Sequence, residues 1–265
     1  MITPNSPVSR NVNIKTDATS LAKAIRRVCV DKPSSPVRML LRTEGISIWT
    51  HDLAKTMNIF LTDSVVDGLK VKEDCILLFS PDDFSDLLST KFRGQEIQIQ
   101  TKANEPIKIR NLNGSSVVYH PADEGDCAMV PDRWFMDKDA KGWIKIPQKN
   151  NESCTSKITI SRESLKQGLV DMKVANAPYV VFNFGNTKSI CTSGHWAAKA
   201  NQSHSVIEAE LEGEEVEIGL SNSLEKLLSI CNGNTFIIYK HRDVPFVIIE
   251  CSDMRLIIAE NRRDA

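Results

Sequence analysis

Apolar residues in four stretches of the chain recur at the spacing of a helix with one buried face. Leu21, Ile25 and Val28 follow the pattern i, i+4, i+7, and Leu165 begins a second copy of that pattern. Residues 80–83 (SPDD) combine a capping residue, a first-turn proline and two acids, which is typical of a helix N-terminus. The four predicted helices cover residues 18–30, 81–92, 161–175 and 221–231.

Short apolar or alternating runs bounded by turn residues predict strands between these helices. In the first half of the chain the strands are expected near residues 12–16, 37–42, 45–50, 55–62, 74–79, 95–101, 106–110 and 115–120. In the second half they are expected near residues 157–160, 178–184, 188–194, 197–202, 205–211, 214–220, 235–240, 245–250 and 254–259.

The two halves of the chain resemble each other, which indicates an internal duplication. Ile14 and Leu21 recur 144 positions later as Ile158 and Leu165, each within a strand that leads into a helix. The second helix of the first half recurs at an offset of 140, and the pair at 106–107 recurs at 245–246. Identity between the halves is low, so chance agreement is the alternative to duplication.

This pattern predicts an α+β chain of two duplicated domains, each with antiparallel sheets and two helices on one face. A long connector separates the domains, and its Trp134 and Trp143 either form a docking surface or pin the connector onto a sheet. The predicted parts are a flexible N-terminus at 1–11, a first domain at 12–120, a connector at 121–155, a second domain at 156–260 and a tail at 261–265.

Composition narrows the possible partners. The 33 Lys and Arg residues balance 34 Asp and Glu residues, giving a net charge of −1, so a nucleic-acid partner must be held by a local basic surface or by topology. No apolar run reaches the roughly 18 residues of a membrane span, and a cytosolic or nuclear protein is expected. The seven cysteines lack zinc spacing, and most are expected to be buried.

Sequence motifs for catalysis are missing. The chain has no GxxxxGK[ST], GxGxxG or GxSxG, and its five histidines have no partner at catalytic or zinc spacing. The acids at 132, 137 and 139 lack the glycine and terminal glutamate of a calcium loop. We therefore expect neither an enzyme nor a cofactor or metal site, although an enzyme with a site between the two halves stays an alternative.

Several segments resemble the DNA sliding clamps of the PCNA type over residues 12–260. They are the hairpin at 45–52 (GISIWTHD), the hairpin start at 243–248 (DVPFVI) and the ending at 255–259 (RLIIA). Residues 115–123 (SSVVYHPAD) are similar to the clamps of tailed bacteriophages, which favours a viral or phage origin. The long connector and the basic chain end, 262–263, depart from the family pattern.

The resemblance implies a polymerase processivity factor: a ring, expected as a homotrimer, that encircles duplex DNA, is opened by a clamp loader and tethers DNA polymerase. A subunit of a heterotrimeric ring, such as a checkpoint clamp, is an alternative. A monomeric clamp-like factor is another, against which the near-zero net charge argues. In such a ring one subunit would contribute Val117, Val118, Tyr119 and His120, and its neighbour Ala198, Lys199, Ala200, Asn201 and Gln202.

The resemblance also implies that the helices face DNA, and the predicted helices carry more basic than acidic residues. The expected phosphate contacts are Lys23, Arg26, Arg27, Lys91, Arg93, Arg162, Lys166, Lys173 and Lys226. Clamps of this family also capture aromatic-bearing peptides in a pocket beside the connector. The matching positions are His51, Lys55, Thr56, Trp143, Ile144, Ile146, Pro245, Ile257 and Ala259.

Overall fold

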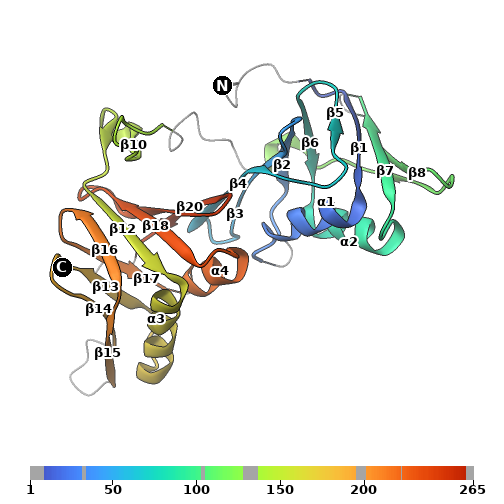
Figure 1. The fold of residues 1–265 in the computed structure, drawn as a ribbon. Coiled ribbons are helices and arrows are strands. Elements are labelled where there is room, and N and C mark those ends of the chain that lie inside the picture. The colour runs from blue at the N-terminus through green and yellow to red at the C-terminus, as the bar shows by residue number, and fades with distance from the viewer. Residues whose placement is uncertain are drawn as a thin grey trace. The chain divides into compact units, whose positions relative to one another are not determined.

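The computed structural model describes residues 9–31, 34–102, 105–127, 137–194, 201–221 and 223–260. The chain divides into two compact units, Met1–Asp132 and Arg133–Ala265. Both units contain the same order of elements, namely strand, helix, five strands, helix and three strands (Figure 1). All strands within the units pair in antiparallel fashion.

The first unit contains two sheets that are joined through its two helices. Strands β5-β1-β7-β8-β9 form one sheet, and β4, β3, β2 and β6 are neighbours in that order in another. Helix α1 connects β1 to β2, and α2 connects β6 to β7. The elements are β1 (Val12–Asp17), α1 (Ala18–Arg26), β2 (Val37–Leu41), β3 (Ile46–His51), β4 (Met57–Ser64), β5 (Lys70–Val71), β6 (Cys75–Phe79), α2 (Pro81–Lys91), β7 (Glu96–Thr101), β8 (Ile107–Asn111) and β9 (Ser116–Tyr119).

The second unit repeats this arrangement. Strands β16, β12, β18, β19 and β20 are neighbours in that order, and β15-β14-β13-β17 form the other sheet. The elements are β12 (Ser156–Ser161), α3 (Arg162–Ala175), β13 (Val180–Phe184), β14 (Ser189–Gly194), β15 (Gln202–Ile207), β16 (Ala209–Gly213), β17 (Val216–Leu220), α4 (Ser223–Ile230), β18 (Thr235–Lys240), β19 (Phe246–Cys251) and β20 (Met254–Ala259).

The duplication predicted from the sequence is confirmed by this topology. Strand β12 begins 144 positions after β1, and α3 begins 144 positions after α1. The helix caps repeat as well: Asp17 accepts a hydrogen bond from the amide of Ser20 at 2.7 Å, and Ser161 accepts one from Ser164 at 3.1 Å. Two copies of one supersecondary unit therefore make up the α+β fold.

Helices α1 and α3 bury most of their predicted apolar stripes, with Leu169 half-buried. Leu21 and Ile25 of α1 are fully buried, as is Leu165 of α3. Helix α3 approaches strand β13 so closely that a Cβ atom at Gly168 would lie 2.6 Å from the ring of Phe182. A larger residue at Gly168 would push the helix off its sheet.

The structure differs from the sequence prediction at several elements. Helix α1 ends at Arg26 instead of residue 30, and the short strand β5 was not expected. The strands predicted at 197–202 and 205–211 are instead β15 and β16, which meet at Glu208, and residues 195–200 lie outside the described ranges. The inward side chains of β15 are Ser203 and Ser205, so this strand lacks the apolar alternation by which strands are found.

The connector is more ordered than the predicted loop. It contains the 3-10 helices at Glu124–Asp126 and Pro147–Lys149 and a small ribbon of β10 (Lys145–Ile146) and β11 (Glu152–Ser153). Asp139 fixes a turn before this ribbon, because its carboxylate accepts hydrogen bonds from the Ser153 hydroxyl and the Trp143 amide, which lower its pKa. Residues 128–136, which include Trp134, lie outside the described part of the chain.

The cysteines are small core residues, as predicted. Six are buried and Cys29 is half-buried. Burial raises the pKa of Cys75 and Cys154 to about 12, so these thiols stay protonated at neutral pH. No helix in the described ranges is long and apolar enough to cross a membrane.

Candidate nucleic-acid and subunit interfaces

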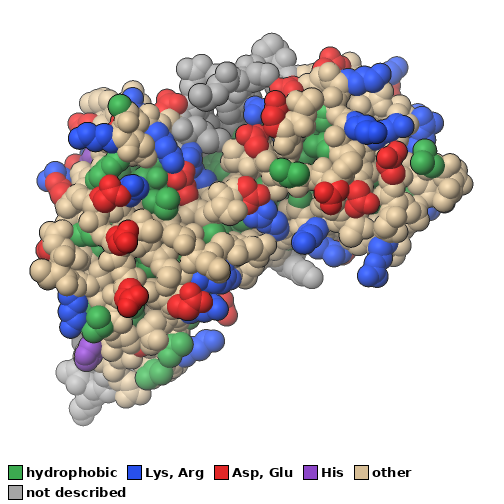
Figure 2. Space-filling model, in the orientation of Figure 1, with side chains coloured by type: hydrophobic (Ala, Val, Ile, Leu, Met, Phe, Trp, Pro, Cys, Tyr) green, Lys and Arg blue, Asp and Glu red, His purple; other side chains and the backbone are tan. Residues whose placement is uncertain are grey.

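Four of the predicted DNA contacts are exposed on the helix side of the first unit. Lys23 and Arg26 lie on α1, Lys91 ends α2, and Arg93 follows it. Lys and Arg side chains are visible around both helices in Figure 2. Arg26 also forms an exposed salt bridge at 3.0 Å with Asp86 of α2, which reduces its free charge.

Arg27 differs from its neighbours on α1. It is half-buried, and its guanidinium lies 3.5 Å from the hydroxyl of Ser64 on β4, to which it donates a hydrogen bond. Its side chain therefore points into the unit, away from the surface that carries Lys23 and Arg26.

In the second unit the predicted contacts divide into two groups. Lys166 and Lys173 are exposed on α3, and Lys226 is half-buried on α4. Arg162 instead donates hydrogen bonds to the carbonyl oxygens of Leu228, of Cys231 at 2.6 Å and of Gly233 at 3.3 Å. These carbonyls lie at the C-terminal end of α4, so Arg162 caps that helix and has a structural role.

Strands β9 and β15 each end a sheet and have one strand partner among the described residues. On β9, Val117 and Tyr119 are half-buried, whereas Val118 is 57% exposed. Of the predicted β9 contacts, His120 follows the strand. An unpaired edge that exposes apolar side chains is a template for another strand.

The β15 edge also carries exposed apolar surface. Val206 is 63% exposed on the strand, and Val170 and Val174 are exposed one turn apart on the neighbouring helix α3, where Figure 2 shows hydrophobic side chains at the surface. Of the residues predicted for this edge, Gln202 begins β15 and Asn201 precedes it. Ala198, Lys199 and Ala200 fall outside the described residues.

A buried carboxylate fastens β15 to α3. Asp171 of α3 is 2% exposed, and its Oδ1 accepts hydrogen bonds from the Ser203 and Ser205 hydroxyls at 2.8 and 3.1 Å and from the Gln167 amide at 3.3 Å. Its Oδ2 accepts the thiol hydrogen of Cys191 at 3.0 Å. Burial, together with this hydrogen bond, raises the pKa of Cys191 to about 12. The carboxylate therefore bonds α3 to two hydroxyls of the edge strand β15 and to the thiol of the neighbouring strand β14.

The predicted peptide-binding residues of the first unit surround the β3–β4 turn. His51 is half-buried, and Lys55 and Thr56 are exposed. Buried Asp52 shapes this turn by accepting hydrogen bonds from the backbone amides of Thr56 and Met57 at 2.7 and 2.8 Å.

The predicted peptide-binding residues of the second unit differ in accessibility. Pro245 and Ala259 are exposed and Trp143 is half-buried, but Ile144 and Ile146 are fully buried. The two isoleucines therefore anchor the connector and have no surface to offer a partner. Ile257 is 6% exposed.

A charged cluster holds the connector on strand β19. Lys138 forms a salt bridge with Glu250 at 2.9 Å, and Arg255 donates a hydrogen bond from Nε to the same carboxylate at 3.0 Å. Burial raises the pKa of Glu250, but the charges of Arg255 and Lys138 outweigh burial and hold that pKa below its ordinary value.

Comparisons with known proteins rest on the fold. No protein-family model and no curated protein matches the sequence. Among solved structures, A. fulgidus PCNA with the bound C-terminal region of FEN-1 matches with a TM-score of 0.66 and 12% identity over 96% of this chain and 99% of that one. The DNA polymerase III beta subunit of Thermotoga maritima matches with a TM-score of 0.71 and 14% identity over 97% and 67%.

A third structure, the DNA polymerase sliding clamp of Pseudomonas aeruginosa, matches with a TM-score of 0.67 and 11% identity over 98% of this chain and 68% of that one. The chain has the DNA sliding-clamp fold. The expectation drawn from the hairpins and the duplication is thereby confirmed for the fold. Because identity is low, the clamp fold alone follows from this likeness.

The hydrogen-bond network around Asp171 was not predicted from the sequence. Asp171 lies seven residues after Ser164, on the buried face of α3, and a charged residue at such a position is a signal of a buried polar network. Its donors on β14 and β15 are remote in sequence. A charged residue on the buried helix face could therefore have located the carboxylate but not these donors.

We expect Asp171→Asn to loosen the β15 edge. The amide group would face hydroxyl and thiol donors, and a buried unsatisfied group costs about 1–3 kcal/mol. Urea denaturation should show this loss, and hydrogen exchange of the β15 amides should accelerate relative to β13. Asp86→Asn is the matched control, because its exposed salt bridge is worth less than about 1 kcal/mol. Equal effects of the two substitutions would contradict the structural role of Asp171.

Proposed function

We propose that this protein is a processivity factor whose copies close into a ring around duplex DNA and tether DNA polymerase at the replicating genome. The observation that carries the proposal is the match of both units, over 96% of the chain, to a PCNA structure of the same extent. The proposed role is that of a scaffold, with no catalytic step of its own.

Ring closure would join β9 of one copy to β15 of the next. These two edges differ, so their pairing is heterologous, and a heterologous contact repeated with the right rotation closes a ring. Pairing would satisfy the backbone groups of both edges and cover Val118 and Val206. We propose a homotrimer, with a clamp loader to open it.

DNA would be held by topology, with weak help from charge. Arg27 and Arg162 are not proposed as phosphate contacts, because each donates hydrogen bonds within its own unit. The proposed phosphate contacts are the exposed Lys23, Arg26, Lys91, Arg93, Lys166 and Lys173 and the half-buried Lys226. Weak, scattered contacts of this kind allow sliding. A net charge of −1 supplies no general attraction to DNA.

Encirclement predicts salt-resistant retention on DNA with blocked ends. The protein would be loaded at high concentration onto a duplex that is attached to a bead at one end, and the free end would then be capped. The bead would be washed at about 1 M salt, because the Debye length there is only about 3 Å and charge contacts are screened. We expect protein to stay on the capped duplex, to leave after restriction cleavage, and not to load when the cap is added first.

Equal loss from capped and open duplexes in the salt wash would contradict encirclement. That result would leave a monomeric factor that binds DNA by charge alone. Light scattering on the same sample separates this outcome from a chain that needs different subunits to complete a ring.

We further propose that partner peptides bind the second unit at the surface that includes Pro245 and Ala259. In the first unit, taken by itself, His51, Lys55 and Thr56 stay proposed peptide contacts. In the second unit Ala259 ends β20, is exposed and pairs with Phe246 of β19. Ile257 of the same strand supplies an apolar floor. The bound C-terminal region of FEN-1 in the A. fulgidus PCNA structure supports a peptide as the ligand.

Ala259→Glu should weaken peptide binding at least tenfold without unfolding the protein, because it adds charge and bulk at an exposed position beside apolar anchors. The measurement is fluorescence anisotropy with the C-terminal peptide of the polymerase from the same genome. Val65→Glu, at a residue that is 80% exposed in the first unit, is the control. Unchanged affinity of the Ala259→Glu protein would refute this placement of the peptide.

A further inference from the structure

The five-stranded sheet of the first unit exposes a row of cationic side chains on the face that points away from its helices. Lys15 of β1 lies opposite Lys70 of β5 and opposite Gln98 of β7, and Gln98 in turn lies opposite Arg110 of β8. Val12 and Ile14, which alternate with these positions on β1, are buried in the core. The row therefore lies on the side of the sheet opposite the core, which we call the outer face.

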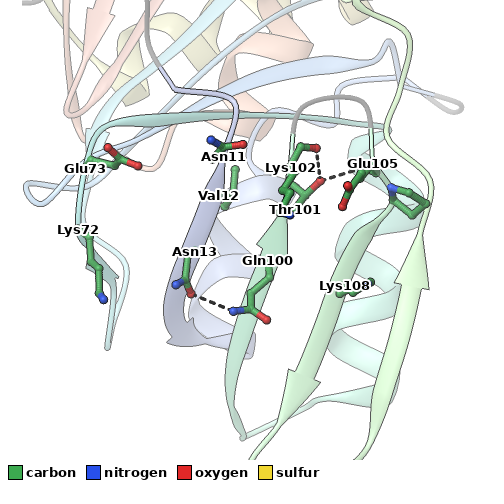
Figure 3. A pocket seen from close by; sticks show the side chains of 11 residues that line it. Asn11, Val12, Asn13, Lys72, Glu73, Gln100, Thr101, Lys102, Glu105 and Lys108 are labelled. Atoms are coloured by element: carbon green, nitrogen blue, oxygen red, sulfur yellow. Dashed lines mark hydrogen bonds between the residues drawn. The ribbon is translucent and has the colours of Figure 1, made fainter.

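A second polar row runs beside the first. Asn13, Gln100 and Lys108 are register partners on β1, β7 and β8. Figure 3 shows these three side chains along a hollow of about 480 Å³ that Lys72 and Lys102 also line. A second hollow of about 320 Å³ lies along Lys15, Gln98 and Arg110. The outer face is therefore concave as well as basic.

The charges of the outer face are not neutralised by the residues that the structure describes. Lys15, Lys70, Lys108 and Arg110 are exposed, and none of them forms a salt bridge with a described residue. Arg110 instead donates two hydrogen bonds to Gln98 at 3.0 and 2.7 Å, and Gln98 donates one to Asn13 at 2.8 Å. The acids nearby, Glu73, Glu96 and Glu105, are fewer than the six cations.

The duplicated unit provides an internal comparison. The positions that match Lys15, Lys70, Gln98 and Arg110 in strand register are Thr159, Glu210, Ile237 and Glu250. The second unit thus places acids at the positions of Lys70 and Arg110 and a neutral threonine at that of Lys15. Its Glu250 is also engaged by Lys138 of the connector. The second unit forms the same strand arrangement without these cations. Folding therefore does not require the basic row of the first unit.

We propose that the outer face binds the phosphate backbone of nucleic acid, at a site separate from the helices that face the encircled duplex. Lysine, arginine and side-chain amides are the groups that contact phosphates without reading sequence. Adjacent strands are about 4.8 Å apart, so the row from Lys70 to Arg110 covers roughly 15 Å, or about four base-pair steps of 3.4 Å. Such a surface holds a stretch of DNA against the outside of the protein.

An acidic protein segment fits the outer face less well. Protein partners depend on apolar or aromatic anchors. The strands of the two rows carry only Val118, at the β9 edge, and the second hollow adds only Leu112, which follows β8. The absence of aromatic side chains from these rows also argues against base stacking, so the contact is with the backbone.

The test compares charge-reversed proteins in fluorescence anisotropy titrations with a 30-base-pair duplex between about 50 and 200 mM salt. We expect Lys15→Glu with Arg110→Glu to weaken binding about tenfold at the lower salt and to reduce the slope of log affinity against log salt by about two. Lys157→Glu is the matched control on the second unit, where Lys157 pairs with Glu212 at 2.6 Å, and should leave binding unchanged.

A helix-face variant, Lys23→Glu with Arg26→Glu, separates this inference from the proposed function. If only the helix-face variant loses affinity, the outer-face site is refuted while encirclement stands. If the outer-face variant loses binding of poly-glutamate but not of the duplex, the surface takes acidic protein and the proposal is wrong. Lys15→Gln with Arg110→Gln removes charge without reversal and keeps the test valid if the glutamate variant misfolds.

Discussion

The unpaired edge strands of its antiparallel sheets place the main constraint on this structure. Every backbone amide and carbonyl along an outer strand must bond to water or to another strand, and an edge with apolar side chains invites the latter. Here β9 and β15 both end sheets, and both expose valines. The buried Asp171 carboxylate fixes β15 to α3 through Ser203 and Ser205, and a fixed strand is what pairing with another copy would require.

Duplication supplies the rest of the architecture and also shows where the two units have diverged. The helix caps, the apolar stripes and the strand order are shared. The outer sheet faces are not, because the first unit carries cations and amides where the second carries acids and a docked connector. Features common to both units serve folding, and features found in one unit are candidates for function.

Much of this organisation could be predicted from the sequence, and the exceptions have physical reasons. The stripes that contain Leu21 and Leu165 predicted the helices because burial of one helix face imposes a regular spacing. Strand β15 was misplaced because Ser203 and Ser205 face inward to a carboxylate, so its buried side is polar. The role of Arg162 could not be foreseen, since its carbonyl partners lie on α4, more than sixty positions later in the sequence. Ile144 and Ile146 matched a binding surface by position, but the connector folds back and buries them.

The most direct test of the central claim is the solution mass of the purified protein, measured by light scattering after size exclusion across a dilution series. We expect a species of three times the 29.6 kDa chain mass at micromolar concentration, which dissociates only on strong dilution. A mass of one chain at every concentration would contradict closure of a ring by this chain alone.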